Sequence, residues 1–173
     1  NVTILSMYVR KLTPPKGAFF LFVPRGTGKS TWIRSFFKDA HIVDLLPNKN
    51  FLKYEGEPSL LEKEILALPK NKIIVIDEVQ RVPALMDEVH NLIENHGYKQ
   101  FVLTGSSARK LKRGAANMLA GRAKLRKLFS LTSCELVYEI SVEQILKFGT
   151  LPMSINSEND EDRYEFFHAY LQT

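Results

Sequence analysis

An apolar run that passes directly into a glycine-rich loop constrains this chain more than any other feature. Residues 18–23 read AFFLFV, and the next eight read PRGTGKST. Gly28, Lys29 and Ser30 fill the last three fixed places of the pattern G-x-x-x-x-G-K-[ST], in which a strand leads through a phosphate-binding loop into a helix. Glycines let backbone N–H groups converge on phosphate oxygens, and the helix directs its positive end at the same anion. The segment therefore predicts a strand, a phosphate-binding loop and a helix.

The expected phosphate-binding residues form one continuous stretch: Pro24, Arg25, Gly26, Thr27, Gly28, Lys29, Ser30 and Thr31. Lys29 can reach the outer phosphates as a point charge, and the Ser30 hydroxyl can ligate Mg²⁺. The first fixed place of the pattern holds Val23 instead of glycine. Because a β-branched residue tolerates positive φ poorly and adds bulk, we expect Val23 to weaken nucleotide affinity or catalysis. The structural alternative is a strand–turn–helix connection that carries these residues without binding phosphate.

Short apolar runs alternate with longer amphipathic ones along the whole chain. Strands are predicted at 18–23, 42–46, 72–76, 101–104 and 123–131, and helices at 29–38, 58–68, 83–96 and 108–119. Nearly continuous apolar runs are typical of parallel strands that are covered on both faces. The alternation predicts an α/β fold with three layers: a mostly parallel central sheet of about five strands, flanked by helices.

Two carboxylates follow the third predicted strand. Asp77 and Glu78 come directly after residues 72–76 and would lie beside the phosphate loop at the end of the sheet. Asp77 would hold the Mg²⁺ shell through Ser30 or water. Glu78 would orient and deprotonate an attacking water. Acids at strand ends more often meet solvent or cap a helix, so the pair gains its meaning from the lysine loop that precedes it.

The fourth predicted strand ends in hydroxyl groups, in the run Thr104-Gly105-Ser106-Ser107. Ser106 is expected to touch the γ-phosphate or the attacking water, and so to sense which nucleotide is bound. The alternative is that Ser106 or Ser107 caps the next helix. Both interpretations can hold for different serines.

The net charge of +5 conceals an uneven distribution. Residues 95–134 contain nine lysines and arginines and no acid, whereas residues 135–173 contain eight acids and two basic residues. A basic stretch without acids can bind nucleic acid phosphates, and residues 109–127 are the candidate contact, although the charge alone is weak evidence for such a partner. No helix-turn-helix or zinc-finger pattern accompanies it. The alternative is a solvated basic face that the acidic tail partly neutralises.

The remaining composition narrows the class of protein. Hydrophobic residues make up 45% and charged residues 25% of the chain, as in ordinary globular domains. No apolar run approaches the ~18 residues of a membrane span, and a secretory-signal layout is absent, so a cytoplasmic protein without a membrane partner is expected. Cys134, the single cysteine, excludes an internal disulfide and is expected to be a packed small residue. For Trp32 we expect a core role rather than stacking on a base.

The two ends of the chain also carry signals. Met7 begins a plausible opening and is predicted to be the native start, and residues 1–7 are set apart as an extension ahead of the core at 8–140. The polar, acidic segment 154–162 is predicted to be an exposed linker. Residues 161–173 place aromatic and apolar side chains at helical spacing without a glycine or proline to end the pattern. The chain is therefore predicted to end inside an amphipathic helix.

Four segments together resemble a known family. FLFVPRGTGKSTW, IIVIDEVQRVP, FVLTGSSARKL and LAGRAKLRKLFSLTSCEL, in this order, resemble prokaryotic AAA+-like ATPases that join this core to a C-terminal domain of unassigned role. The resemblance implies a three-layer P-loop NTPase fold, with an ATPase core at 8–140 and the start of a truncated helical module at 141–173. It also implies ATP and Mg²⁺ as cofactors and Glu78 as the catalytic glutamate. Arg122 would approach the nucleotide phosphates in cis or across a contact in a homo-oligomer; the alternative is an ordinary pair with a carboxylate.

The predicted function is Mg²⁺-dependent ATP hydrolysis that drives a conformational change of an attached C-terminal domain. Lys29, Mg²⁺ and Arg122 would neutralise the charge that develops at the transferred phosphoryl group. The alternatives are a nucleotide-binding switch whose hydrolysis is impaired by Val23, a basic nucleic-acid-binding module, and a small-molecule kinase. A kinase would need an acceptor pocket and a lid that bears arginines.

Overall fold

The central element is a sheet of five parallel strands, seen in a computed structural model that describes residues 8–105, 119 and 121–172. The strands are β1 Phe19–Phe22, β2 His41–Asp44, β3 Ile74–Asp77, β4 Phe101–Gly105 and β5 Lys124–Lys127. They lie in the order β2-β3-β4-β1-β5, and every neighbouring pair is parallel. The prediction of a parallel five-stranded sheet is confirmed, with strand ends shifted by a few residues.

Helices follow most of the strands. They are α1 Lys29–Phe36, α2 Asn48–Gly56, α3 Leu60–Leu66, the 3₁₀ turn η1 Val79–Arg81, α4 Leu85–Glu94, α7 Val142–Phe148, α8 Pro152–Ile155 and α9 Asp160–Leu171. The sequence predicted no helix at α2, because Tyr54 is its one buried residue and its apolar stripe is weak. The helix predicted at 108–119 lies outside the described residues except for its last position.

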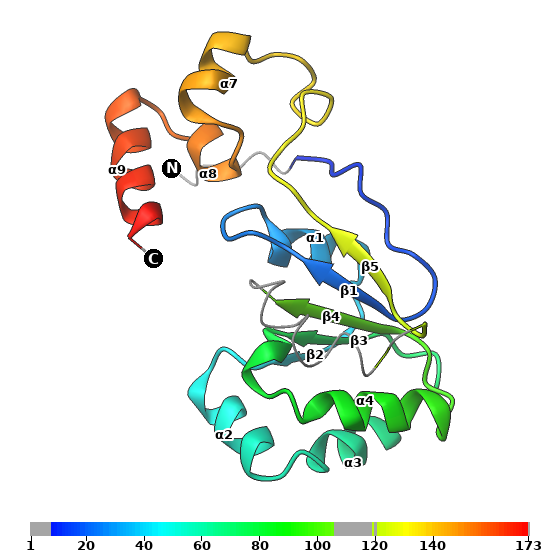
Figure 1. Cartoon of the computed structure of the whole chain (residues 1–173). Helices are drawn as coiled ribbons and strands as arrows, with labels where there is room; N and C mark the ends of the chain where they lie inside the picture. Colours follow the sequence, from blue (N-terminus) through cyan, green and yellow to red (C-terminus); the bar gives the residue numbers. More distant parts are fainter. Residues whose placement is uncertain (1–7, 106–118, 120, 173) are drawn as a thin grey trace.

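Alternate residues of the strands face two different helical layers. On β1, Phe20 and Phe22 belong to a core that also contains Leu61 of α3 and Val89 of α4. Phe19 joins the opposite core, with Trp32 and Ile33 of α1. Figure 1 shows α1 on one side of the sheet and α2, α3 and α4 on the other. This two-sided covering explains why β1, β3 and β4 are apolar almost without interruption, and it confirms the three-layer architecture.

The three last helices form a group outside these layers (Figure 1). The prediction that residues 154–162 are an exposed linker is correct only in part: residues 158–162 are exposed, but Ser154 is buried, and α8 and α9 occupy the two ends of the segment. Ser154 is fully buried and its hydroxyl donates to the Phe148 carbonyl at 2.9 Å. Arg163 donates to the carbonyls of Ser154 and Ser157 at 3.1 and 2.8 Å. Ser154 and the carbonyls of Ser154 and Ser157 thus have partners within the protein, so polarity did not indicate exposure in the first part of this segment.

Two single-residue predictions have different outcomes. Trp32 is buried, stacks edge-on against Phe19, and donates from its indole to the Leu12 carbonyl at 2.9 Å, which confirms its core role. Cys134 is exposed, and the prediction of a packed residue was wrong. It lies in the irregular segment between β5 and α7, where its Sγ is 3.2 Å from the Thr132 hydroxyl. In the part of the chain that is described, none of the helices has the length and apolarity needed to cross a bilayer.

Candidate functional site

The loop between β1 and α1 has the backbone geometry of an anion-binding turn. The buried Thr27 hydroxyl donates to the Pro24 carbonyl at 2.9 Å and closes the loop. Gly26 and Gly28 adopt φ values of +73° and +91°, which are strained for any residue with a Cβ. The Gly28 carbonyl accepts the Trp32 N–H at 2.9 Å, so α1 starts with its free N–H groups directed at the loop. Successive N–H groups in such turns form a concave site for anions.

Val23 does not strain this loop. Among the described residues, the positions with positive φ that are not glycine are Glu78, Val137 and Tyr138, so Val23 has an ordinary backbone conformation. Its side chain is 4% exposed and packs in the core beneath α1 with Phe19 and Trp32. The expected conflict between a β-branched residue and positive φ is therefore absent at this position.

Lys29, the first residue of α1, reaches the two acids at the end of β3. Its Nζ lies 2.6 Å from Asp77 Oδ1 and 2.6 Å from Glu78 Oε1. The lysine side chain is 17% exposed. Burial lowers the pKa of Lys29, but the hydrogen bonds and charges of Asp77 and Glu78 raise it more, so its pKa lies above the ordinary value. Lys29 is therefore a charged group at the mouth of the phosphate loop.

The acids come from a strand that does not pair with β1. β4 lies between β1 and β3, and Thr104 of β4 donates its hydroxyl to Asp77 Oδ1. Asp77 thus has partners from α1 and from β4. The carboxyl ends of β1, β4 and β3 meet at one edge of the sheet, which is where ligands bind in parallel α/β folds.

Glu78 occupies a tight turn at this edge. Its φ of 57° and ψ of 41° lie in the left-handed region, which costs a non-glycine residue about 1–2 kcal/mol. Its carbonyl accepts the Arg81 N–H at 2.9 Å, and Gln80 donates from Nε2 to Glu78 Oε2. The sharp turn after β3 brings the Glu78 carboxylate back toward Lys29. Strained residues held by their surroundings often lie at functional sites.

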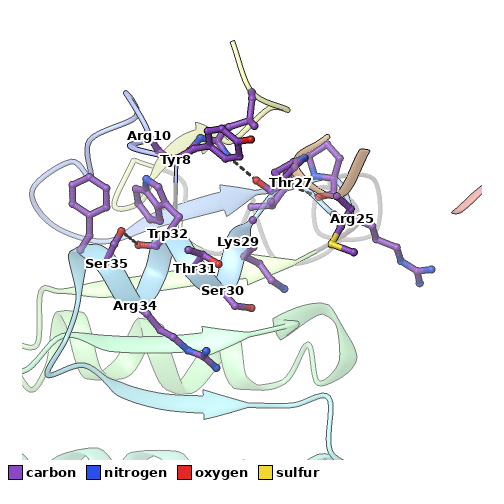
Figure 2. Close-up of a pocket in the computed structure, with 18 of the residues that line it drawn as sticks. Tyr8, Arg10, Arg25, Thr27, Lys29, Ser30, Thr31, Trp32, Arg34 and Ser35 are labelled. Atoms are coloured by element: carbon purple, nitrogen blue, oxygen red, sulfur yellow. Dashed lines mark hydrogen bonds between the residues drawn. The ribbon is translucent and has the colours of Figure 1, made fainter. Parts of the chain in front are cut away.

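A cavity of about 1060 Å³ opens over the phosphate loop. All eight predicted loop residues line it, together with Glu78, so the structure brings most of the predicted site together. Figure 2 shows Lys29, Ser30 and Thr31 at the start of α1, with Tyr8 and Arg10 on the N-terminal segment across from them. On its far side the cavity is bounded by Pro152, Met153 and Asn156 of the α8 segment. The sequence did not predict Tyr8, Arg10 or the α8 residues, since they are distant from the motif along the chain.

The C-terminal segment contacts the loop directly. A Cβ added at Gly26 would lie 3.7 Å from the ring of Tyr170 and 4.0 Å from Leu151 and Phe166. The Tyr170 hydroxyl donates to the Arg25 carbonyl at 3.3 Å. At the other end of the cavity, the Tyr8 hydroxyl donates to Asn156 Oδ1 at 2.8 Å. Helix α9 therefore touches the phosphate loop, and Asn156 at the end of α8 touches the N-terminal segment.

Two predicted catalytic residues do not join this group. Ser106 lies outside the described residues, so its role stays a prediction. Arg122 precedes β5, at the amino edge of the sheet, where it forms an ion pair with Glu94 of α4. The phosphate loop leaves the opposite edge. Arg122 thus shows the alternative arrangement, a pair with a carboxylate, and the approach to the nucleotide in cis that was predicted does not occur in this structure.

A parallel sheet with the order β2-β3-β4-β1-β5, a lysine-bearing phosphate loop after β1 and acids after β3 define a P-loop protein of the nucleotide-binding ATPase type. Comparison with known families agrees, because residues 16–137 match the family described as "AAA domain". The match covers well over half of the chain, and the protein belongs to this AAA family.

Two individual proteins and one solved structure are also similar to this chain. An uncharacterized protein of Mycobacterium bovis and another of Mycobacterium tuberculosis are each 29% identical over 153 residues, which are 87% of this chain and 33% of theirs. The chain thus spans about a third of the length of these curated relatives. Among solved structures, the Aeropyrum pernix ORC2 protein in its ADP form aligns with a TM-score of 0.49 and 10% identity, covering 92% of this chain and 70% of that one.

Proposed function

We propose that residues 8–140 are an ATPase core that binds ATP over the phosphate loop and hydrolyses it with Mg²⁺. The observation that carries this proposal is the position of Lys29, the last residue of the phosphate-loop pattern but one, whose ammonium group lies 2.6 Å from a carboxylate oxygen of each acid. A cation at this point can exchange the carboxylates for phosphate oxygens when a nucleotide enters. The family to which the chain belongs supports ATP as the nucleotide.

The oxygen donors near Lys29 suit a magnesium ion. Ser30 is exposed on the first turn of α1, and the Asp77 carboxylate lies at the end of β3 with partial exposure. Mg²⁺ prefers a hydroxyl, one or two carboxylates and phosphate oxygens as ligands. Ser30 and Asp77 would hold the ion, and the ion would neutralise charge on the phosphates.

Glu78 is the proposed general base. Its carboxylate lies beside Lys29 and borders the cavity, where an attacking water would be located. A base within hydrogen-bond reach of that water accepts its proton as the bond to phosphorus forms. Lys29 would then stabilise the negative charge on the transferred group, and the loop N–H groups would fix the phosphates.

The nucleobase would occupy the end of the cavity away from Glu78. The residues proposed to surround it are Tyr8 and Val9 of the N-terminal segment and Pro152 and Met153 of α8, which all line the cavity. Aromatic and apolar side chains with a few polar groups are typical of sites for flat organic ligands. The cavity volume of about 1060 Å³ slightly exceeds the ~300–1,000 Å³ usual for such sites.

Conformational coupling is the second part of the proposal. Residues 141–173 would be the start of a helical C-terminal module, which the nucleotide would reach through α8 and α9. Because α9 packs around Gly26 and α8 lines the cavity, a bound nucleotide would meet surfaces from both parts of the chain. A ligand that contacts both parts shifts the equilibrium between two arrangements of those parts. The size of the shift is set by the difference in the ligand's affinity for the two arrangements.

Calorimetric titration with ATP and Mg²⁺ tests the binding step. The wild-type chain is expected to bind, and Lys29→Ala is expected to weaken binding at least tenfold, since the main cation at the loop is lost. Lys63→Gln provides a control on α3 that removes one charge from an exposed pair with Glu57, the residue that follows α2. Equal affinities of the wild type and Lys29→Ala would exclude a phosphate-binding role for the loop.

A further inference from the structure

Arg10 connects the phosphate loop to two other parts of the chain. Its Nη1 donates to the Thr27 carbonyl at 2.6 Å and its Nη2 donates to the Phe129 carbonyl at 2.6 Å. Its Nε donates to Glu135 Oε1 at 3.2 Å. Figure 2 shows Arg10 directed toward Thr27 from the N-terminal segment. One guanidinium group thus joins the N-terminal segment, the loop and the connection that follows β5.

The bond to Thr27 fixes the orientation of a peptide group inside the loop. The C=O of Thr27 and the N–H of Gly28 belong to one planar peptide unit and point in opposite directions. When Arg10 holds the carbonyl, the Gly28 N–H is directed to the other side of the loop. Gly28 itself, at φ +91°, has few restraints of its own, so an external hydrogen bond has a large influence on this peptide.

Glu135 in turn fixes Arg10. The two side chains are only 9% and 4% exposed. Besides the bond from Arg10, Glu135 accepts the backbone N–H groups of Lys11 at 2.7 Å and Thr132 at 3.0 Å. Burial raises the pKa of Glu135, but these backbone and arginine hydrogen bonds lower it more, so the group stays ionised at neutral pH. The pair is therefore a rigid, charged support in a buried location.

We propose that Arg10 is a positioning residue for the phosphate loop, held in place by Glu135, and that it aligns the Gly28 N–H for the β-phosphate of a nucleoside di- or triphosphate. The role is indirect, because all three nitrogen positions of the guanidinium donate to the protein. This inference rests on the proposed nucleotide-binding function and adds a residue outside the stretch 16–137 that matches the AAA family.

The arrangement also relates the loop to the C-terminal segment. Glu135 and Phe129 both lie in the connection between β5 and α7. A shift of this connection would therefore move Arg10, and with it the Thr27–Gly28 peptide. By reciprocity, a bound phosphate that fixes this peptide would stabilise the position in which the connection contacts Arg10.

Affinity for ADP compared with AMP provides the test, because AMP lacks the β-phosphate. Calorimetry on the full chain would compare the wild type with Arg10→Gln, Arg10→Lys, Glu135→Gln and the double variant Arg10→Gln/Glu135→Gln. Arg10→Gln is expected to weaken ADP binding about tenfold and to change AMP binding less than about twofold. Arg10→Lys should also weaken ADP binding, by about fivefold, since an ammonium group cannot donate to Thr27, Phe129 and Glu135 with the geometry of a guanidinium group. The double variant should match Arg10→Gln within about twofold, because Glu135 acts through Arg10.

Lys63→Gln, which removes a charge from the exposed pair with Glu57, should leave both affinities unchanged. Full ADP affinity in Arg10→Lys would overturn the proposal, because it would show that only the charge matters. Equal losses of affinity for ADP and for AMP in Arg10→Gln would also overturn the proposal, because they would show that the substitution disturbs the whole binding site and not the contact with the β-phosphate. Should Arg10→Gln not fold, Arg10→Lys and Glu135→Gln still decide between these outcomes. A wild-type chain that binds no ADP would refute the proposed function itself, whereas a binding chain with unaffected Arg10 variants would refute only this inference.

Discussion

At the scale of single residues, Val23 departs from the phosphate-loop pattern, and this departure either strains the loop backbone or contributes packing to the core. The sequence suggested that a β-branched residue would disturb a backbone that needs positive φ. The structure places Val23 at the end of β1 with its side chain in the core under α1. Valine at this position thus contributes packing, and the following glycines supply the conformational freedom of the loop.

Replacing Val23 by glycine should therefore destabilise the fold and not restore a function. Val23→Gly is expected to lower the free energy of unfolding by about 2–4 kcal/mol, from lost burial and added backbone entropy. Urea unfolding measures this, and Val43→Gly, at a buried position on β2 away from the loop, provides the matched control. ATP affinity of the folded variant should stay within about threefold of the wild type. A tenfold gain in affinity in Val23→Gly alone would instead favour the nucleotide switch impaired by Val23.

Glu78 leads to a second prediction at this scale. Glu78→Gln should reduce phosphate release from ATP about 100-fold or more, since an amide cannot accept the proton of the attacking water. ATP binding should be equal or tighter, because the variant removes one of the two carboxylates that compete with phosphate for Lys29. Release assays and calorimetry on the same preparation measure both effects. Glu57→Gln, in an exposed pair with Lys63, is the control, and unchanged turnover in Glu78→Gln would exclude Glu78 as the base.

At the scale of helices and strands, local signals predicted the half of the site that follows β1 and β3. The phosphate loop and the two acids each lie directly after an apolar run, so strand burial and turn chemistry determine their place. Thr104 reaches Asp77 because β4 lies between β1 and β3, and this pairing order cannot be inferred from local pattern. The same applies to α2, whose single buried residue left too little periodicity to indicate a helix.

The contact of α9 with the phosphate loop gives a prediction at this scale. The Asn159 side chain caps α9 by accepting the Asp162 N–H at 2.9 Å, and Asn159→Ala should destabilise the helix by about 1 kcal/mol. Since Phe166 and Tyr170 of α9 pack around Gly26, hydrogen exchange should accelerate at α9 and also in the loop at residues 25–28.

The control for this experiment is the N-cap of α7. The Ser141 hydroxyl accepts the Gln144 N–H at 3.2 Å, and Ser141→Ala should accelerate exchange in α7 but leave the loop unchanged. If hydrogen exchange in the loop is equally fast in Asn159→Ala and in the wild type, the packing of α9 does not protect the phosphate loop.

At the scale of the whole molecule, the site is assembled from both ends of the described chain. Tyr8 pairs with Asn156, and Arg10 pairs with Glu135, over sequence separations of 148 and 125 residues. Neither pair carries a signal that single-sequence reasoning can detect, because the residues are ordinary polar types without a motif. The sequence therefore predicted the phosphate end of the cavity, and the end lined by the N-terminal segment and α8 emerged only from the fold.

The Arg10–Glu135 pair makes global stability depend on pH in a defined direction. The pKa of Glu135 in the folded chain is lower than its ordinary value of 4.5, so its carboxylate binds protons more readily in the unfolded chain. Its stabilising effect is fully present above pH 4.5 and is lost as the pH falls through the lowered folded pKa. Breaking a buried ion pair by removing one charge costs about 3–5 kcal/mol.

Glu135→Gln should therefore lower the free energy of unfolding by about 3 kcal/mol at pH 7, and the difference from the wild type should narrow as the pH is lowered below 4.5. Urea titrations followed by the fluorescence of Trp32, the single tryptophan, measure both curves in one protein background. Glu57→Gln, whose carboxylate is exposed and paired with Lys63, should change stability far less at neutral pH. If the difference in unfolding free energy between the wild type and Glu135→Gln stays constant down to acid pH, the charge of Glu135 contributes nothing to stability. The hydrogen bonds of its side chain would then stabilise this contact without the charge.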